Sequence, residues 1–155
     1  MDKYNINKTD INKLIPHREP FIFIDELINI KKLETATGIK TFKGDENFFK
    51  GHFPGQPVVP GVILVEMMAQ TAAALIAFSI REETLDKIVY LMNLENTKFR
   101  KPVFPDDKVF ANVKALRSKG RAWRFEGVTF DINHNKVCEA AWSAMIMNRD
   151  NEKNS

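Results

Sequence analysis

The segment Gly51–Gln70 reads GHFPGQPVVPGVILVEMMAQ and has two halves with opposite physical properties. Three prolines and three glycines fall within its first eleven residues. Because proline fixes φ and lacks an N–H, and glycine tolerates left-handed turns, this half is predicted to be a rigid loop. Pro60 suits the first turn of a helix, and residues 62–80 are nearly all apolar or small. The second half therefore predicts a helix that is buried on all sides.

Two side chains in this segment can carry chemistry. The helix contains one charge, Glu66, and the loop before it contains one histidine, His52. A lone carboxyl in an apolar helix is costly to ionise unless it is paired or hydrogen-bonded, and an imidazole titrates near neutral pH. Together they could serve as a general acid and a general base. Two structural alternatives stay open: His52 may only cap a loop carbonyl, and Glu66 may only bind a neighbouring strand.

The composition is that of one folded domain. A chain of 155 residues with 44% hydrophobic and 10% aromatic residues has enough apolar material for a sizeable core. We expect a single domain over 1–148 and a polar tail over 149–155. The single cysteine, Cys138, excludes an intramolecular disulfide and fits a reducing compartment.

Targeting and charge point to the cytoplasm. The N-terminus is polar, without the apolar region of a secretion signal, and polar residues interrupt the helix too often for a membrane span. We therefore expect a cytoplasmic protein without membrane insertion. A net charge of +3 is too small to predict nucleic-acid binding.

The remaining pattern is mostly that of strands. A short helix is predicted at residues 11–15, capped by Thr9-Asp10 and ended by Pro16. Alternating and β-branched runs predict two strands before the central helix and four after it in a meander, with turns at Lys119-Gly120 and 133–135. The predicted strands are Phe21–Ile30, Leu33–Phe42, Lys87–Phe99, Lys108–Leu116, Ala122–Ile132 and Lys136–Met147. An antiparallel sheet of about six strands around one long helix is an α+β fold, and its free edges favour a dimer.

The predicted start of the helix adds a third chemical group. Backbone N–H groups near Gly61 have no partner within the helix and lie at the positive end of its dipole, where they can hold an oxyanion. An oxyanion site, a base and an acid suit removal of a proton beside a carbonyl with loss of a β-hydroxyl. The sequence has no metal-ligand spacing and no dinucleotide or phosphate-loop motif, so no cofactor is expected.

The same residues resemble a known family. The segments 51–55, 57–62 and 66–70 look like the signature of the β-hydroxyacyl-[acyl-carrier-protein] dehydratases of the FabZ type. The segments 14–21, LIPHREPF, and 98–105, KFRKPVFP, are also similar to parts of that family. The resemblance covers residues 14–147, nearly the whole predicted domain.

This resemblance implies a hot-dog fold, in which the sheet wraps the helix, and dimers that often assemble into hexamers. It implies that His52 and Glu66 are catalytic and come from opposite subunits, and that the Gly61 N–H binds the thioester carbonyl. Val62, Phe53 and Gln70 complete the candidate substrate-binding set. The implied substrate is a (3R)-hydroxyacyl chain on the phosphopantetheine of acyl carrier protein, and the product is the trans-2-enoyl thioester.

Other interpretations concern the partner and the reaction. Lys98, Arg100 and Lys101 form a basic run that could dock the acidic carrier protein, although most such runs are merely solvated. His17 is interpreted as structural. Two alternative functions are a hot-dog acyl thioesterase, against which His52 argues, and a non-catalytic acyl-chain binding protein.

Overall fold

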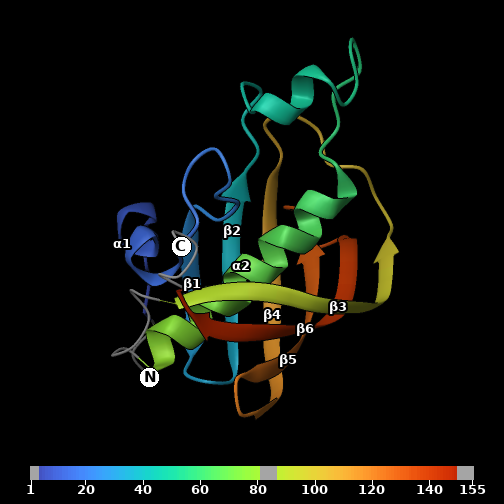
Figure 1. Cartoon of the computed structure of the whole chain (residues 1–155). Coiled ribbons are helices and arrows are strands. Elements are labelled where there is room, and N and C mark those ends of the chain that lie inside the picture. Colours follow the sequence, from blue (N-terminus) through green and yellow to red (C-terminus); the bar gives the residue numbers. More distant parts are fainter. Residues whose placement is uncertain (1–3, 81–86, 150–155) are drawn as a thin grey trace, which may run out of the picture.

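The computed structural model describes residues 4–80 and 87–149, and in it a curved sheet wraps one long helix (Figure 1). The helix α2 spans Gly61–Ile80, close to its predicted bounds. The other elements in chain order are α1 (Lys8–Leu14), β1 (Glu26–Lys31), β2 (Thr35–Thr41), the 3-10 helix η1 (Asn47–Lys50), β3 (Lys87–Phe99), β4 (Lys108–Lys119), β5 (Ala122–Phe130) and β6 (Lys136–Asn148).

The sheet has the strand order β1-β2-β4-β5-β6-β3, with every neighbouring pair antiparallel. The predicted four-strand meander is wrong for β3, because this strand crosses to the far edge and pairs with β6 instead of β4. Only β4, β5 and β6 form a meander. The β4–β5 turn uses Gly120 at φ 60°, which a glycine adopts without strain.

The core lies between α2 and the concave face of the sheet. Large side chains such as Trp142, Phe23 and Met68 are fully buried there. Close approach of the sheet requires Gly38, because a Cβ at that position would lie 2.2 Å from Thr71 Oγ1 on α2. By length and composition α2 is the one described helix that could cross a membrane, yet 67% of its apolar window is buried inside the protein. It is therefore the core helix of the domain.

Three predicted details near the N-terminus and the loop need correction. The helix α1 is capped by Asn7, whose side chain accepts a hydrogen bond from Asp10 N at 3.1 Å, and not by Thr9-Asp10. Residues 21–25 precede β1 instead of belonging to it, because Phe23 N donates to the Gln70 side chain instead of to a strand. The helix η1 was not predicted. Most of the predicted polar tail, residues 150–155, lies outside the described residues.

Candidate active site

The loop that carries His52 is closed by its own backbone. His52 N donates to Phe48 O at 3.0 Å, and Val58 N donates to His52 O at 2.9 Å. Val59 N, donating to Val103 O at 2.8 Å, then ties the end of the loop to the segment before β4. In Figure 1 this part of the chain projects beyond the sheet at the end where α2 begins. These bonds hold the prolines and glycines of the loop in one conformation.

The ring of His52 is oriented by a backbone carbonyl. Its Nδ1 lies 2.8 Å from Val58 O, and the ring stacks on Phe53 with centroids 4.0 Å apart. A hydrogen on Nδ1 donates to this carbonyl and leaves the lone pair on Nε2. This is the tautomer that a general base requires. The carbonyl cap and a catalytic role are therefore compatible, because each uses a different ring nitrogen.

The first turn of α2 follows this loop directly in the sequence. A Cβ on Gly61 would lie 2.8 Å from the ring of Phe99, so a larger residue here would require that ring to move. Ile63 N already donates to Pro60 O at 2.9 Å, whereas the amides before it precede the first intrahelical bond. Val62 is 70% exposed and Phe53 is 54% exposed. These two of the predicted substrate-binding residues therefore expose apolar surface, whereas Gln70 is buried.

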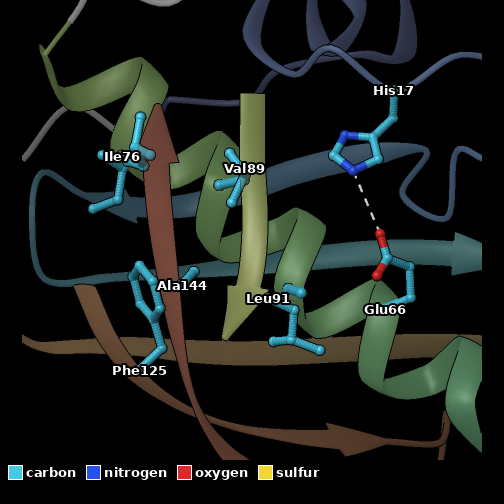
Figure 2. A pocket seen from close by; sticks show the side chains of 10 residues that line it. His17, Glu66, Ile76, Val89, Leu91, Phe125 and Ala144 are labelled. Carbon is cyan, nitrogen blue, oxygen red and sulfur yellow. Dashed lines mark ion pairs between the residues drawn. The ribbon is translucent and has the colours of Figure 1, made fainter. Parts of the chain in front are cut away.

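Glu66 is held by two neighbours from its own chain. Its Oε1 accepts a hydrogen bond from Gln70 Nε2 at 3.1 Å and lies 3.4 Å from His17 Nε2 (Figure 2). Gln70 is itself fixed, since its Nε2 also donates to Phe21 O at 3.0 Å and its Oε1 accepts from Phe23 N at 2.8 Å. Gln70 thus binds Glu66 and satisfies the backbone at once.

An apolar cavity begins at Glu66 and His17 and runs along α2 (Figure 2). The space there measures about 450 Å³, and a second hollow of about 880 Å³ shares part of its wall; both volumes include open solvent. Trp123 and Arg121 line the second hollow. The residues common to both are Ala73, Ile76, Val89 and Ile146. A carboxyl at the head of an apolar cavity suits a ligand with a polar reacting end and a hydrocarbon tail.

The structure does not join all the predicted site residues within one chain. No hydrogen bond or ion pair between His52 and Glu66 occurs among the residues at 4–80 and 87–149. Two cations of the basic run pair with acids: Arg100 Nη2 is 2.9 Å from Glu139 Oε1, and Lys101 pairs with Asp131. The hydrogen bond from Arg100 holds the pKa of Glu139 below its usual range. Two of the three candidate docking cations therefore already have acidic neighbours.

His17 is the residue whose place the sequence did not indicate. It was interpreted as structural, yet its ring lies against Glu66 and lines the cavity. The segment that resembles the dehydratase family does contain it, but contact between residues 49 positions apart leaves no local pattern. Within the described part of the chain, no group of three or more His, Cys, Asp or Glu side chains could hold a metal ion.

Comparison with known proteins places this geometry in a family. The FabA-like domain model matches residues 15–141. The chain belongs to the FabA-like family. It is 46% identical over 137 residues to the 3-hydroxyacyl-[acyl-carrier-protein] dehydratase FabZ of Rhodospirillum rubrum, covering 88% of this chain and 85% of that protein. It is 45% identical over 143 residues to the protein of the same name from Gluconobacter oxydans, covering 92% of this chain and 84% of that protein.

Solved structures of low sequence identity share the fold of this FabA-like chain. The dehydratase heterocomplex ApeI:P from Xenorhabdus doucetiae superposes with a TM-score of 0.77 at 15% identity, covering 90% of this chain and 91% of that one. The uncharacterized protein PH1136 from Pyrococcus horikoshii superposes with a TM-score of 0.62 at 19% identity, covering 83% of this chain and 87% of that one. The predicted resemblance to FabZ-type dehydratases and the predicted hot-dog fold are both confirmed.

Proposed function

We propose that this FabA-like protein is a (3R)-hydroxyacyl-[acyl-carrier-protein] dehydratase, a hydro-lyase of fatty acid biosynthesis. Two observations carry the proposal: the Nδ1 of His52 is bound to a backbone carbonyl, which leaves Nε2 for the substrate proton, and the Glu66 carboxyl stands at the head of an apolar cavity. Its relatives at 45–46% identity bear the name of this activity. The product is the trans-2-enoyl thioester and water.

The reaction needs one proton removed and one delivered. Nε2 of His52 takes the proton from the carbon next to the thioester carbonyl, and the electrons of that C–H bond form the new double bond. The bond from the β-carbon to its hydroxyl breaks, and Glu66 supplies the proton with which the hydroxyl leaves as water. The N–H of Gly61 stabilises the charge that develops on the carbonyl oxygen. A proton passing from His52 to Glu66 restores both groups.

We assign the two halves of each site to different subunits. No hydrogen bond or ion pair joins His52 and Glu66 within the described residues, and this supports a site in which a partner subunit supplies one of the two. The strand β3 is paired on one side only, by β6, and it exposes Tyr90, Met92 and Leu94 at 44–54% of their surface. Apolar edge strands are protected in native proteins by pairing or cover. Pairing of two β3 strands about a two-fold axis would cover this edge and form a homodimer, which further contacts could assemble into a hexamer.

The cavity is proposed to hold the acyl chain. It starts at Glu66 and reaches Ile76, which is about 15 Å further along α2 at 1.5 Å per residue. Its remaining wall is aliphatic or aromatic, with Ala69 and Ala73 leaving space on the helix side. The hydrocarbon tail would lie there while the polar thioester end remains at the helix N-terminus.

The acyl chain would arrive on an acyl carrier protein, as the names of the relatives state for those enzymes. We propose that the phosphopantetheine of this carrier holds it. We keep Lys98, Arg100 and Lys101 as candidate docking residues for this acidic partner. The enzyme would work without a cofactor, because the proposed steps need only proton transfer and an N–H donor. We also propose that it works in the cytoplasm.

Ultraviolet absorbance of the enoyl conjugation band tests the proposal. Incubated with a crotonyl thioester, the wild type should add water and the band should fall. His52→Ala and Glu66→Gln should each reduce the rate by about 10²–10⁴, because each removes the base or the acid. Both variants should keep the wild-type melting temperature, whereas an inert wild type on several chain lengths would reject the assignment.

A further inference from the structure

We propose that His17 is a positioning residue for the dehydration: it fixes the carboxyl of Glu66 so that one oxygen is tied to the protein and the other faces the substrate. This inference rests on the proposed function. His17 leaves the end of α1 on a loop, and its Nε2 lies 3.4 Å from Glu66 Oε1 (Figure 2). Both side chains are only about one-fifth exposed, at 19% and 22%, so the contact is shielded from solvent.

The surroundings of His17 and Glu66 indicate which of the two side chains is the donor. Glu66 Oε1 also accepts from Gln70 Nε2 at 3.1 Å, and a carboxylate oxygen accepts more than one donor. When Nε2 of His17 carries a hydrogen, it can present that hydrogen to the same oxygen, 3.4 Å away. Its Nδ1 is buried and has no hydrogen-bond partner among the described residues, so Nε2 is the ring atom that makes the polar contact. The separation of 3.4 Å is longer than that of an ordinary hydrogen bond, and catalytic contacts of this kind tighten when substrate binds.

Two donors on one oxygen restrict the carboxyl plane. In the described part of the chain, the contacts of the Glu66 carboxyl are all made by Oε1, and Oε2 remains for the ligand in the cavity. Gln70 alone comes from one turn further along the same helix and leaves rotation of the carboxyl possible. His17 approaches from the loop after α1 and restricts this rotation. Acid catalysis depends on this orientation, since a small misplacement of a catalytic group can cost about a hundredfold in rate.

The backbone and the ring of His17 are themselves held in place by neighbouring residues. Arg18 Nη1 donates to Ile15 O at 2.9 Å and to His17 O at 2.6 Å, which stiffens the loop. The imidazole lies nearly parallel to the ring of Phe21, at 16°. Phe21 O in turn accepts from Gln70 Nε2, so the two donors to Glu66 are connected through this segment.

Steady-state hydration of a crotonyl thioester by four full-length variants tests the role. His17→Ala should lower kcat by about tenfold to a hundredfold with little change in KM, because the acid is misplaced while binding is intact. His17→Gln should recover most of kcat, because its amide nitrogen can occupy the place of Nε2. His134→Asn, on an exposed hairpin, is the matched control and should match the wild type. Glu66→Ala supplies the background for a double-mutant cycle.

In the Glu66→Ala background, His17→Ala should cause no further loss, since His17 acts only through that carboxyl. Any of three results would overturn the role: unchanged kcat in His17→Ala, no recovery in His17→Gln at wild-type melting temperature, or losses that add in the double variant. An inert wild type would instead reject the dehydratase itself, so the two failures are distinguishable.

Discussion

The two halves of the candidate site are built in different ways. The carboxyl half is internal: Glu66 sits on the core helix and is held by Gln70 and His17 from its own chain. The imidazole half is external: His52 lies on a loop beyond the sheet, half-buried, and its ring is oriented by Val58 and Phe53 of the same loop. One half is thus positioned by the core and the other by a self-closed loop.

The difference shows which part of the site a single chain can complete. The Glu66 half has its orienting groups and its cavity within one protomer. The His52 half has an oriented ring but no acid beside it in the described chain. A site whose acid is fixed by the fold and whose base is presented outward is suited to assembly between two subunits. The following predictions test this asymmetry.

Blocking the β3 edge should have the largest effect. The double variant Met92→Asp/Leu94→Asp places charge on the exposed apolar edge and should give monomers without the combined site. The hydration rate should fall by about 10²–10⁴, as if the base were absent. Light scattering after size exclusion measures the mass. Leu116→Asp, on a similarly exposed residue of β4, is the control, and a fully active monomer would refute the two-subunit site.

Removing Gln70 should damage stability as well as rate, unlike any change at His52. Gln70→Ala leaves the buried Phe23 N–H and the Phe21 carbonyl without partners, which should cost about 2–4 kcal/mol. Urea unfolding measures this loss. Gln56→Ala, on the exposed loop, should leave stability unchanged. If both variants unfold alike, Gln70 is not the link between the core and Glu66.

Filling the cavity should separate substrates by length. Ala73 lines both hollows and Ala77 only the second, so Ala73→Leu should lower kcat/KM for a dodecenoyl thioester by about tenfold and spare the crotonyl thioester. Ala77→Leu should affect the long substrate less. Equal loss on both substrates in Ala73→Leu would show general damage to the helix instead of a shorter acyl site.

The smallest effect is expected at the candidate docking surface. Arg100→Glu should raise KM severalfold for a carrier-linked substrate and leave a short thioester mimic unaffected, because steering by charge acts only on the acidic carrier. Lys13→Glu, an equal charge change on α1, is the control. Since Arg100 already pairs with Glu139, an equal effect on both substrates would mean that the ion pair is only structural.

The sequence predicted the elements that depend on local pattern. The core helix, β3 and the glycine turn at Gly120 lie where periodicity, proline and glycine placed them. It did not predict that β3 leaves the meander, because strand order depends on which edge is free after the sheet has curved. The segment 21–25 was read as strand, since its apolar pattern does not distinguish a ladder bond from the bond to Gln70.

The candidate acid and base can be picked out from the sequence, whereas their surroundings cannot. His52 and Glu66 stand out as a lone histidine and a lone charge in a distinctive segment, and family resemblance strengthened both. The contact of Gln70 with Glu66 follows from helix geometry, because residues four positions apart lie on the same face of a helix. His17 could not, since its contact with Glu66 arises only when α1 packs beside α2.

Subunit complementation tests the central claim most directly. Purified His52→Ala and Glu66→Gln chains should each be nearly inactive in hydration of the crotonyl thioester. When the two are co-expressed, each mixed dimer should contain one site with both wild-type groups. A random one-to-one mixture should therefore recover about one quarter of wild-type activity. Recovery at that level would establish that the base and the acid come from different subunits, whereas a mixture no more active than its parents would contradict the account.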